Sequence, residues 1–116
     1  MNRGDVYRTK LRLPDRAVPG QFAERNKYVV MLRGISAETD IPLVIASTHD
    51  PARAPRPFEV IVGTTEGFDH ETVIDCRWPY TLPKAWFKAE EFRFALLPDV
   101  MREVSVALLI GLQMKV

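Results

Sequence analysis

The sequence predicts one mainly β domain, residues 1–116, in which a small and strongly bent antiparallel sheet or barrel is followed by a C-terminal helix. Two observations predict this fold class. Short segments rich in β-branched residues recur between turn signals, and the last segment of the chain changes to helical spacing. A length of 116 residues fits one domain that buries its own core.

Six segments read as strands: residues 4–13, 27–34, 42–50, 58–62, 72–78 and 88–97. Residues 14–26 are predicted as a long loop, and residues 79–87 as a turn that contains two prolines. The first strand alternates strictly, which places Arg8, Lys10 and Arg12 on one strongly basic face.

The C-terminal segment, residues 97–116, has the spacing of an amphipathic helix. Its apolar stripe consists of Leu97, Val100, Met101, Val104, Leu108 and Gly111. Pro98 suits a first helical turn, and Asp99 suits the positive end of the helix dipole. We expect this stripe to pack on the sheet as core and not to bind a cofactor.

Composition excludes several classes of protein. Hydrophobic residues make up 47% of the chain and charged residues 27%, which argues against general disorder. Cys76 is the only cysteine, so no intramolecular disulfide forms, and we expect a small buried strand residue in a reducing cytoplasm. His49, His70 and Cys76 do not form a metal-ligand motif, so neither a metal nor another cofactor is expected.

No segment predicts contact with a membrane. The N-terminus lacks the apolar core of a signal peptide. The longest apolar stretch, residues 104–112, is far shorter than the roughly 20 residues that span a bilayer. We therefore expect a cytoplasmic protein with no membrane partner.

The net charge of +1 conceals a strong asymmetry. Residues 1–33 carry eight Lys or Arg against three acidic residues, whereas residues 34–75 carry two basic residues against eight acidic ones. A basic N-terminal third attracts phosphates. The alternative is that these charges only face solvent on a strand, and charge alone does not decide between the two.

The stretch "TVIDCRWPYTL", residues 72–82, combines charges and aromatic rings at the end of a predicted strand. Asp75 and Arg77 are two residues apart, so they share a strand face and could simply pair with each other. Trp78 and Tyr80 follow, and aromatic rings beside basic groups suit the unstacked bases of single-stranded RNA. Trp78 could instead cover the end of a barrel or lie in a dimer interface.

The order of several motifs resembles the MazF/PemK/Kid family of toxins. These motifs are "RGDVY" (residues 3–7), "KYVVML" (27–32), "LVIAST" (43–48), "TVIDCRWPYTLPK" (72–84) and the C-terminal helix. Together they cover nearly the whole chain. The resemblance implies an SH3-like barrel, a homodimer and a type II toxin–antitoxin pair. It also implies metal-independent cleavage of single-stranded mRNA, and an antitoxin whose acidic flexible segment occupies the RNA groove.

The resemblance also implies a set of catalytic residues. Thr48 matches the family position and would donate a hydrogen bond to a non-bridging phosphate oxygen. Lys27 would bind the scissile phosphate, although the family has arginine followed by proline where this chain has Lys27 followed by Tyr28. Asp75 is the candidate base and Arg77 the candidate acid or phosphate clamp, in the reverse order of the Arg-Cys-Asp of one family branch.

Five further residues are predicted to bind the substrate: Arg25, Ser47, His49, Trp78 and Tyr80. Arg25 lies two residues before Lys27, so it shares that strand face and could take over its role. His49 is an alternative acid–base group because histidine titrates near neutral pH. We expect all of these side chains to converge on one basic hollow sized for a sugar–phosphate chain.

Two other functions compete with RNA cleavage. One is a non-catalytic toxin similar to CcdB, which binds gyrase through its dimer face and C-terminal helix, although the end "IGLQMKV" lacks a tryptophan. The other is an SH3-like module that binds RNA or protein without cleaving it, and the reversed order of Asp75 and Arg77 is compatible with that function.

Overall fold

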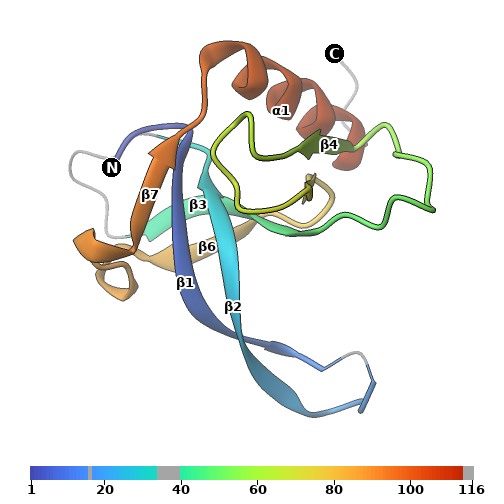
Figure 1. Cartoon of the computed structure of the whole chain (residues 1–116). Coiled ribbons are helices and arrows are strands. Elements are labelled where there is room, and N and C mark those ends of the chain that lie inside the picture. Colours follow the sequence, from blue (N-terminus) through green and yellow to red (C-terminus); the bar gives the residue numbers. More distant parts are fainter. Residues whose placement is uncertain (16, 34–39, 114–116) are drawn as a thin grey trace.

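A bent antiparallel sheet crossed by one helix forms the body of the protein (Figure 1). The computed structural model describes residues 1–15, 17–33 and 40–113. The strands are β1 (Asp5–Pro14), β2 (Phe22–Met31), β3 (Asp40–Thr48), β4 (Glu59–Val62), β5 (Thr72–Asp75), β6 (Tyr80–Pro83) and β7 (Phe92–Ala95). Two 3₁₀ turns, η1 (Lys84–Trp86) and η2 (Ala89–Glu91), lie between β6 and β7, and α1 (Pro98–Gly111) follows.

The strands pair in the order β4-β5-β3-β2-β1-β7, and β6 pairs with the first half of β3. β3 therefore pairs with β6 along residues 40–43 and with β5 along residues 46–48. This division bends the sheet around β3. The predicted mainly β fold with one C-terminal helix is confirmed, whereas the described strands do not close into a barrel, because β4 and β7 remain the two ends of the pairing path.

Successive side chains along a β-strand point to opposite faces of the sheet, and here each face carries an apolar layer. Val6, Val30 and Val44 belong to the layer that packs beneath α1. Their chain neighbours Tyr7 and Val29 belong to a second layer on the opposite face. Both faces of the central strands are thus buried, which accounts for their nearly continuous apolar sequence.

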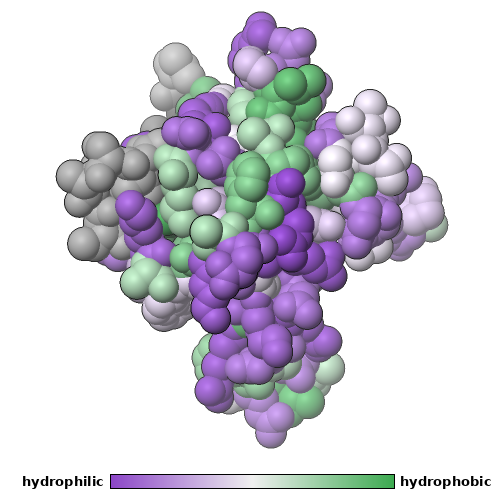
Figure 2. Space-filling model, turned by 60° about the vertical axis from the view of Figure 1, so that its left-hand side comes forward, coloured by the Kyte–Doolittle hydropathy of each residue, from purple (hydrophilic) through white to green (hydrophobic). Residues whose placement is uncertain are grey.

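The predicted loop at residues 14–26 is wrong in extent, because β2 begins at Phe22. Lys10, Leu11 and Arg12 of β1 pair with residues 24–26 of β2. The resulting two-stranded arm extends beyond the body in Figure 1, and its surface is mostly hydrophilic in Figure 2. Leu11 of β1 is buried in the second apolar layer, but residues 22–27 of β2 include no buried side chain, so the β2 side of the arm lacks the apolar alternation that identifies a buried strand.

Three other boundaries also differ from the prediction. The predicted turn at residues 79–87 contains β6, which pairs residue by residue with the start of β3. The predicted strand 88–97 contains η2 and only four residues of strand. The predicted strand 72–78 ends at Asp75, where the backbone N–H of Arg77 turns back to the Asp75 carboxylate.

The C-terminal helix begins at Pro98 and ends at Gly111, inside the predicted range. Met101 and Val104 are buried against the sheet as the apolar stripe predicts. Leu97 is 72% exposed because it precedes the first helical turn. The last three residues of the predicted helix, 114–116, and Arg16 of the basic N-terminal third lie outside the described residues.

Candidate functional site

A hollow of about 590 Å³ opens between the base of the β1–β2 arm and the segment that follows β5. The arm and the sheet supply Leu13, Pro14, Asp15, Ala17, Arg25, Lys27, Ile45 and Ser47, and the later segment supplies Asp75, Trp78 and Tyr80. Six of the nine residues predicted for the site therefore line one cavity: Arg25, Lys27, Ser47, Asp75, Trp78 and Tyr80.

The cationic side of the hollow comes from strand periodicity. Arg25 and Lys27 are two residues apart on β2, so their side chains leave the same face. The Lys27 Nζ donates a hydrogen bond to the Ser47 Oγ on β3 at 3.3 Å. Two cations and a hydroxyl on one wall form a surface suited to the phosphates of a nucleic-acid strand.

The opposite wall carries an aspartate that is bound to its near neighbour. The Arg77 Nη2 donates to the Asp75 Oδ2 at 2.9 Å, and the Arg77 Nε donates to the Asp75 Oδ1 at 3.2 Å. The guanidinium carbon also lies 4.3 Å from the ring centre of Phe58 and 5.7 Å from that of Trp78. The hydrogen bond to Asp75 raises the pKa of Arg77, so this group is a fixed cation and a poor proton donor.

Behind this pair lies a second ion pair that the sequence analysis did not identify. Both guanidinium nitrogens of Arg53 donate to the buried carboxylate of Glu59, at 2.9 and 2.7 Å. Glu59 stands opposite Asp75 across β4 and β5. The hydrogen bond from Arg53 lowers the pKa of Glu59. A single acid in the otherwise apolar run "FEVIV" was the available signal for such a buried pair.

Thr48, His49 and Arg77 do not line the hollow, so the expected convergence on a single cavity is incomplete. Thr48 follows Ser47 on β3, and alternation sends its side chain to the other face of the sheet. The Thr48 Oγ1 lies 3.0 Å from the His70 Nε2. His49 is buried, with its Nε2 3.4 Å from the Glu71 Oε1.

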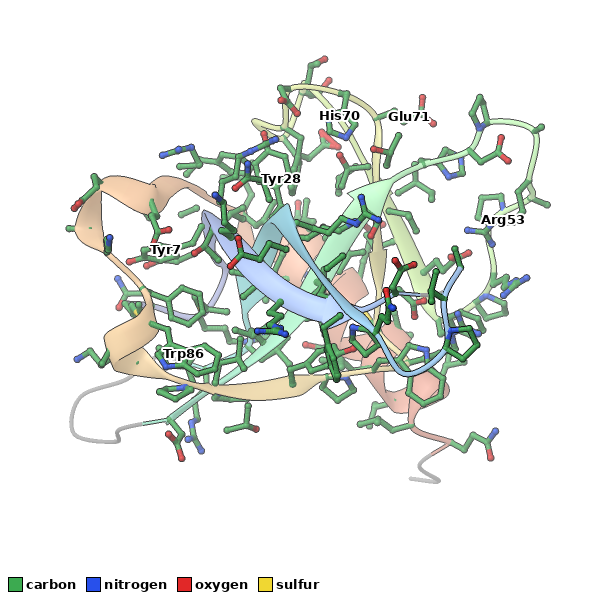
Figure 3. All side chains as sticks on the ribbon, turned by 90° about the horizontal axis from the view of Figure 1, so that it is seen from below. Tyr7, Tyr28, Arg53, His70, Glu71 and Trp86 are labelled. Carbon is green, nitrogen blue, oxygen red and sulfur yellow. The ribbon has the colours of Figure 1, made fainter. Side chains whose placement is uncertain are left out.

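The contact between Thr48 and His70 belongs to a second polar cluster. The His70 Nδ1 is hydrogen-bonded to Asp69, and the Arg8 Nη1 lies 3.4 Å from the Asp69 Oδ2. Figure 3 shows His70 beside Tyr28 and Glu71 at the upper edge of the view. Partial desolvation would raise the pKa of Asp69, but hydrogen bonds from Tyr28 and His70, together with the nearby positive charges, lower it overall.

The described residues contain neither a candidate metal site nor a membrane-spanning helix. No group of three or more His, Cys, Asp or Glu side chains within residues 1–15, 17–33 and 40–113 has the arrangement of a metal site. No helix in the same residues is long and apolar enough to cross a membrane.

Among known proteins, the chain matches solved structures but no family model and no curated sequence. No protein-family model matches the sequence, and no curated protein matches it significantly. An endoribonuclease in complex with its cognate antitoxin, from a mycobacterial species, superimposes with a TM-score of 0.72 at 18% identity, covering 100% of this chain and 98% of that one. An endoribonuclease from a mycobacterial species gives a TM-score of 0.74 at 18% identity, covering 100% and 94%.

The Mycobacterium tuberculosis toxin MazF-mt6 gives a TM-score of 0.67 at 14% identity, covering 97% of this chain and 99% of that toxin. Each likeness covers at least 94% of both chains. They show that the chain has the fold of these endoribonuclease and toxin structures, as the motif order in the sequence implied.

Proposed function

We propose that this chain is a MazF-type toxin, an endoribonuclease that cleaves single-stranded mRNA without a metal ion. The observation that carries the proposal is the hollow in which Arg25, Lys27, Asp75, Trp78 and Tyr80 meet. It lies on a fold shared with endoribonucleases and with the toxin MazF-mt6. Cations bind phosphates and exposed aromatic rings stack on bases, which together suit an unpaired RNA strand.

The chemistry proposed for this site is an internal transesterification. The ribose 2′-oxygen attacks the adjacent phosphorus, the bond to the 5′-oxygen breaks, and a cyclic phosphate and a 5′-hydroxyl result. Lys27 and Arg25 bind neighbouring phosphates of the strand beside the cleavage site, which holds the strand in place and offsets its charge. Because Arg77 engages both oxygens of Asp75, we assign this pair to positioning and charge balance at the rim of the hollow.

Two partners follow from the same proposal. One is a cognate antitoxin whose acidic flexible segment competes with RNA for the cations of the hollow. The structural likeness to an endoribonuclease in complex with its cognate antitoxin supports it. The other partner is a second copy of the chain, as a homodimer, and the expected location of both is the cytoplasm.

A cleavage assay tests the proposal. The purified chain is incubated with a long single-stranded RNA in EDTA, and the products are mapped at nucleotide resolution. We expect discrete fragments that end in cyclic phosphates, and their loss in Lys27→Met. Lys84→Met removes an equally charged but exposed lysine outside the hollow, so it should cleave like the wild type.

Two other results would contradict the proposed activity. RNA that is bound but never cut would identify an RNA-binding module of the same fold. RNA that is neither bound nor cut would favour a toxin that acts on a protein, such as the gyrase-binding class.

A further inference from the structure

Asp69, His70 and Thr48 lie on the face opposite the hollow and are arranged in sequence like an acid–base relay. Asp69 is hydrogen-bonded to the Nδ1 of His70, and the Nε2 of the same ring lies 3.0 Å from the Thr48 hydroxyl. A carboxylate on one ring nitrogen fixes the tautomer and orientation of an imidazole, so that the other nitrogen can exchange a proton. The histidine is therefore oriented for proton transfer at Nε2.

The relay is accessible to a large substrate. The side chain of His70 is 40% exposed and that of Asp69 is 59% exposed, so neither residue belongs to the core. Thr72 Oγ1 donates to the His70 carbonyl at 2.9 Å, which fixes the backbone on which the ring is mounted. The ring is thus held in position while part of its surface stays exposed.

Charges near the relay favour an anionic substrate. Arg8 lies beside Asp69 at 3.4 Å, and its guanidinium carbon is 4.9 Å from the ring centre of Tyr28. Lys10 and Arg12 continue the same face of β1 outward along the arm, and both are exposed. A strand of RNA that lies along this face would meet three cations that lead to His70.

The relay and the hollow meet at the end of one strand. Ser47 points into the hollow, where it accepts a hydrogen bond from Lys27, and its neighbour Thr48 contacts His70 on the other face. An RNA strand that passes around the base of the arm would therefore touch both. In the hollow, by contrast, Asp75 is already engaged by Arg77, and Arg77 is a poor proton donor.

We propose that His70, oriented by Asp69 and adjoining Thr48, is the proton-transfer residue of the RNA cleavage reaction; this inference rests on the proposed function. The His70 Nε2 takes the proton of the 2′-hydroxyl as the bond from O2′ to phosphorus forms and the bond from phosphorus to O5′ breaks. The imidazolium then delivers that proton to O5′, so the step needs no other reactant. Thr48, released from Nε2 by the substrate, donates to a non-bridging oxygen of the scissile phosphate, while Lys27 holds a neighbouring phosphate of the same strand in the hollow.

The test separates proton transfer from binding and folding. His70→Gln keeps a polar side chain but cannot carry the proton, and we expect single-turnover cleavage to fall about 100-fold or more. Affinity for a 2′-deoxy-substituted RNA, which cannot be cleaved, should stay within about threefold. Thr48→Ser should restore most of the activity that Thr48→Val loses, and circular dichroism checks that each variant is folded.

The pH profile supplies a readout that a merely structural role would not change. The charged and titratable groups around His70 are Asp69, Arg8, Tyr28 and Glu71. The wild-type rate should depend on pH, because the reaction includes a proton transfer by a side chain, and His70→Gln should lose that dependence. Asp69→Asn should lower the rate about tenfold.

The matched control is Asp99→Asn, because Asp99 is also exposed and paired with an arginine, Arg102, but lies on α1. It should leave cleavage unchanged. If both His70→Gln and Asp69→Asn cleave RNA at the wild-type rate and with the wild-type pH profile, the proton-transfer role of His70 is wrong. The endoribonuclease proposal would still stand. A wild-type chain that cuts no RNA would overturn both.

Discussion

The guanidinium of Arg77 holds both carboxylate oxygens of Asp75, two residues earlier in the chain, with Nη2 to Oδ2 at 2.9 Å and Nε to Oδ1 at 3.2 Å. The backbone N–H of Arg77 donates to the same carboxylate at 3.0 Å. This local clamp ends β5 and stacks the guanidinium on Phe58. The reversed order of acid and base therefore determines the shape of the rim of the hollow.

Arg77→Lys tests this clamp while the charge is kept. Lysine cannot bind a carboxylate through a planar fork or stack on Phe58 in the same way, so we expect stability to fall by about 1 kcal/mol. RNA cleavage should fall about tenfold as Asp75 loses its fixed position. Arg93→Lys is the control, since Arg93 is exposed and donates to backbone carbonyls alone among the contacts described. If Arg77→Lys and Arg93→Lys have the same stability and the same cleavage rate, Arg77 has no special role.

Trp78→Ala tests base stacking at the hollow. Trp78 is 60% exposed and lines the cavity, and a stacked base is worth about 1–3 kcal/mol. We therefore expect affinity for single-stranded RNA to fall about 10- to 100-fold, measured by fluorescence anisotropy. Trp86→Ala removes a tryptophan that is 59% exposed but lies on η1 outside the hollow, so it should bind nearly as well as the wild type. A similar loss in both variants would indicate nonspecific surface effects.

The candidate site shows how far sequence reasoning can go. Lys27, Asp75 and Trp78 were predictable because charged and aromatic side chains at the ends of apolar strands stand out from their neighbours. Thr48 was predicted to share their cavity and does not, because one position along β3 reverses the face of the sheet. Which face of the sheet a given side chain occupies depends on how its strand pairs, and the paired strands are distant in sequence.

The fold shows the same limit. The central strands could be predicted from their runs of apolar residues, and the helix from the spacing of its apolar residues. The first half of β2 and all of β6 carry no such pattern, because neither segment contains a buried residue. The contact between His70 and Thr48 was not predicted because the two residues are 22 positions apart in the chain and only the fold brings them together.

Arg53→Met tests the ion pair behind the site. The Glu59 carboxylate is only 3% exposed and would lose the two hydrogen bonds from Arg53, which should cost about 1–2 kcal/mol at neutral pH. The pKa of Glu59 is lowered from 4.5 in the folded protein, so the pair stabilises the fold above that pH. This contribution is lost as the pH falls through the folded-state pKa.

Urea unfolding at several pH values measures this effect. The difference between wild type and Arg53→Met should be largest near pH 7 and shrink as the pH falls below 4.5. A difference that stays constant or grows in acid would contradict the assignment. Arg102→Met removes a highly exposed arginine paired with Asp99 and should change stability by less than about 0.5 kcal/mol.

Cys76 should be chemically inert in the folded protein. Its side chain is fully buried, and desolvation, with the negative charge of Asp75, raises its pKa to about 12. Because the thiolate is the reactive form, we expect no measurable reaction with Ellman's reagent at pH 8 in the native state and rapid reaction in urea. Fast labelling of the native protein would show that the end of β5 opens readily.

Gly111→Ala reverses the usual effect of removing a glycine from a helix. Alanine normally favours a helix by about 1 kcal/mol, but a Cβ at this position would lie 2.7 Å from the Cys76 carbonyl oxygen. Backbone cannot move aside as a flexible side chain can, so we expect a net loss of about 1–3 kcal/mol in denaturant unfolding. Gly63→Ala, whose Cβ would meet only the Glu71 Cα at 4.0 Å, should be tolerated. A more stable Gly111→Ala would mean that α1 does not pack this closely on the segment that holds Arg77.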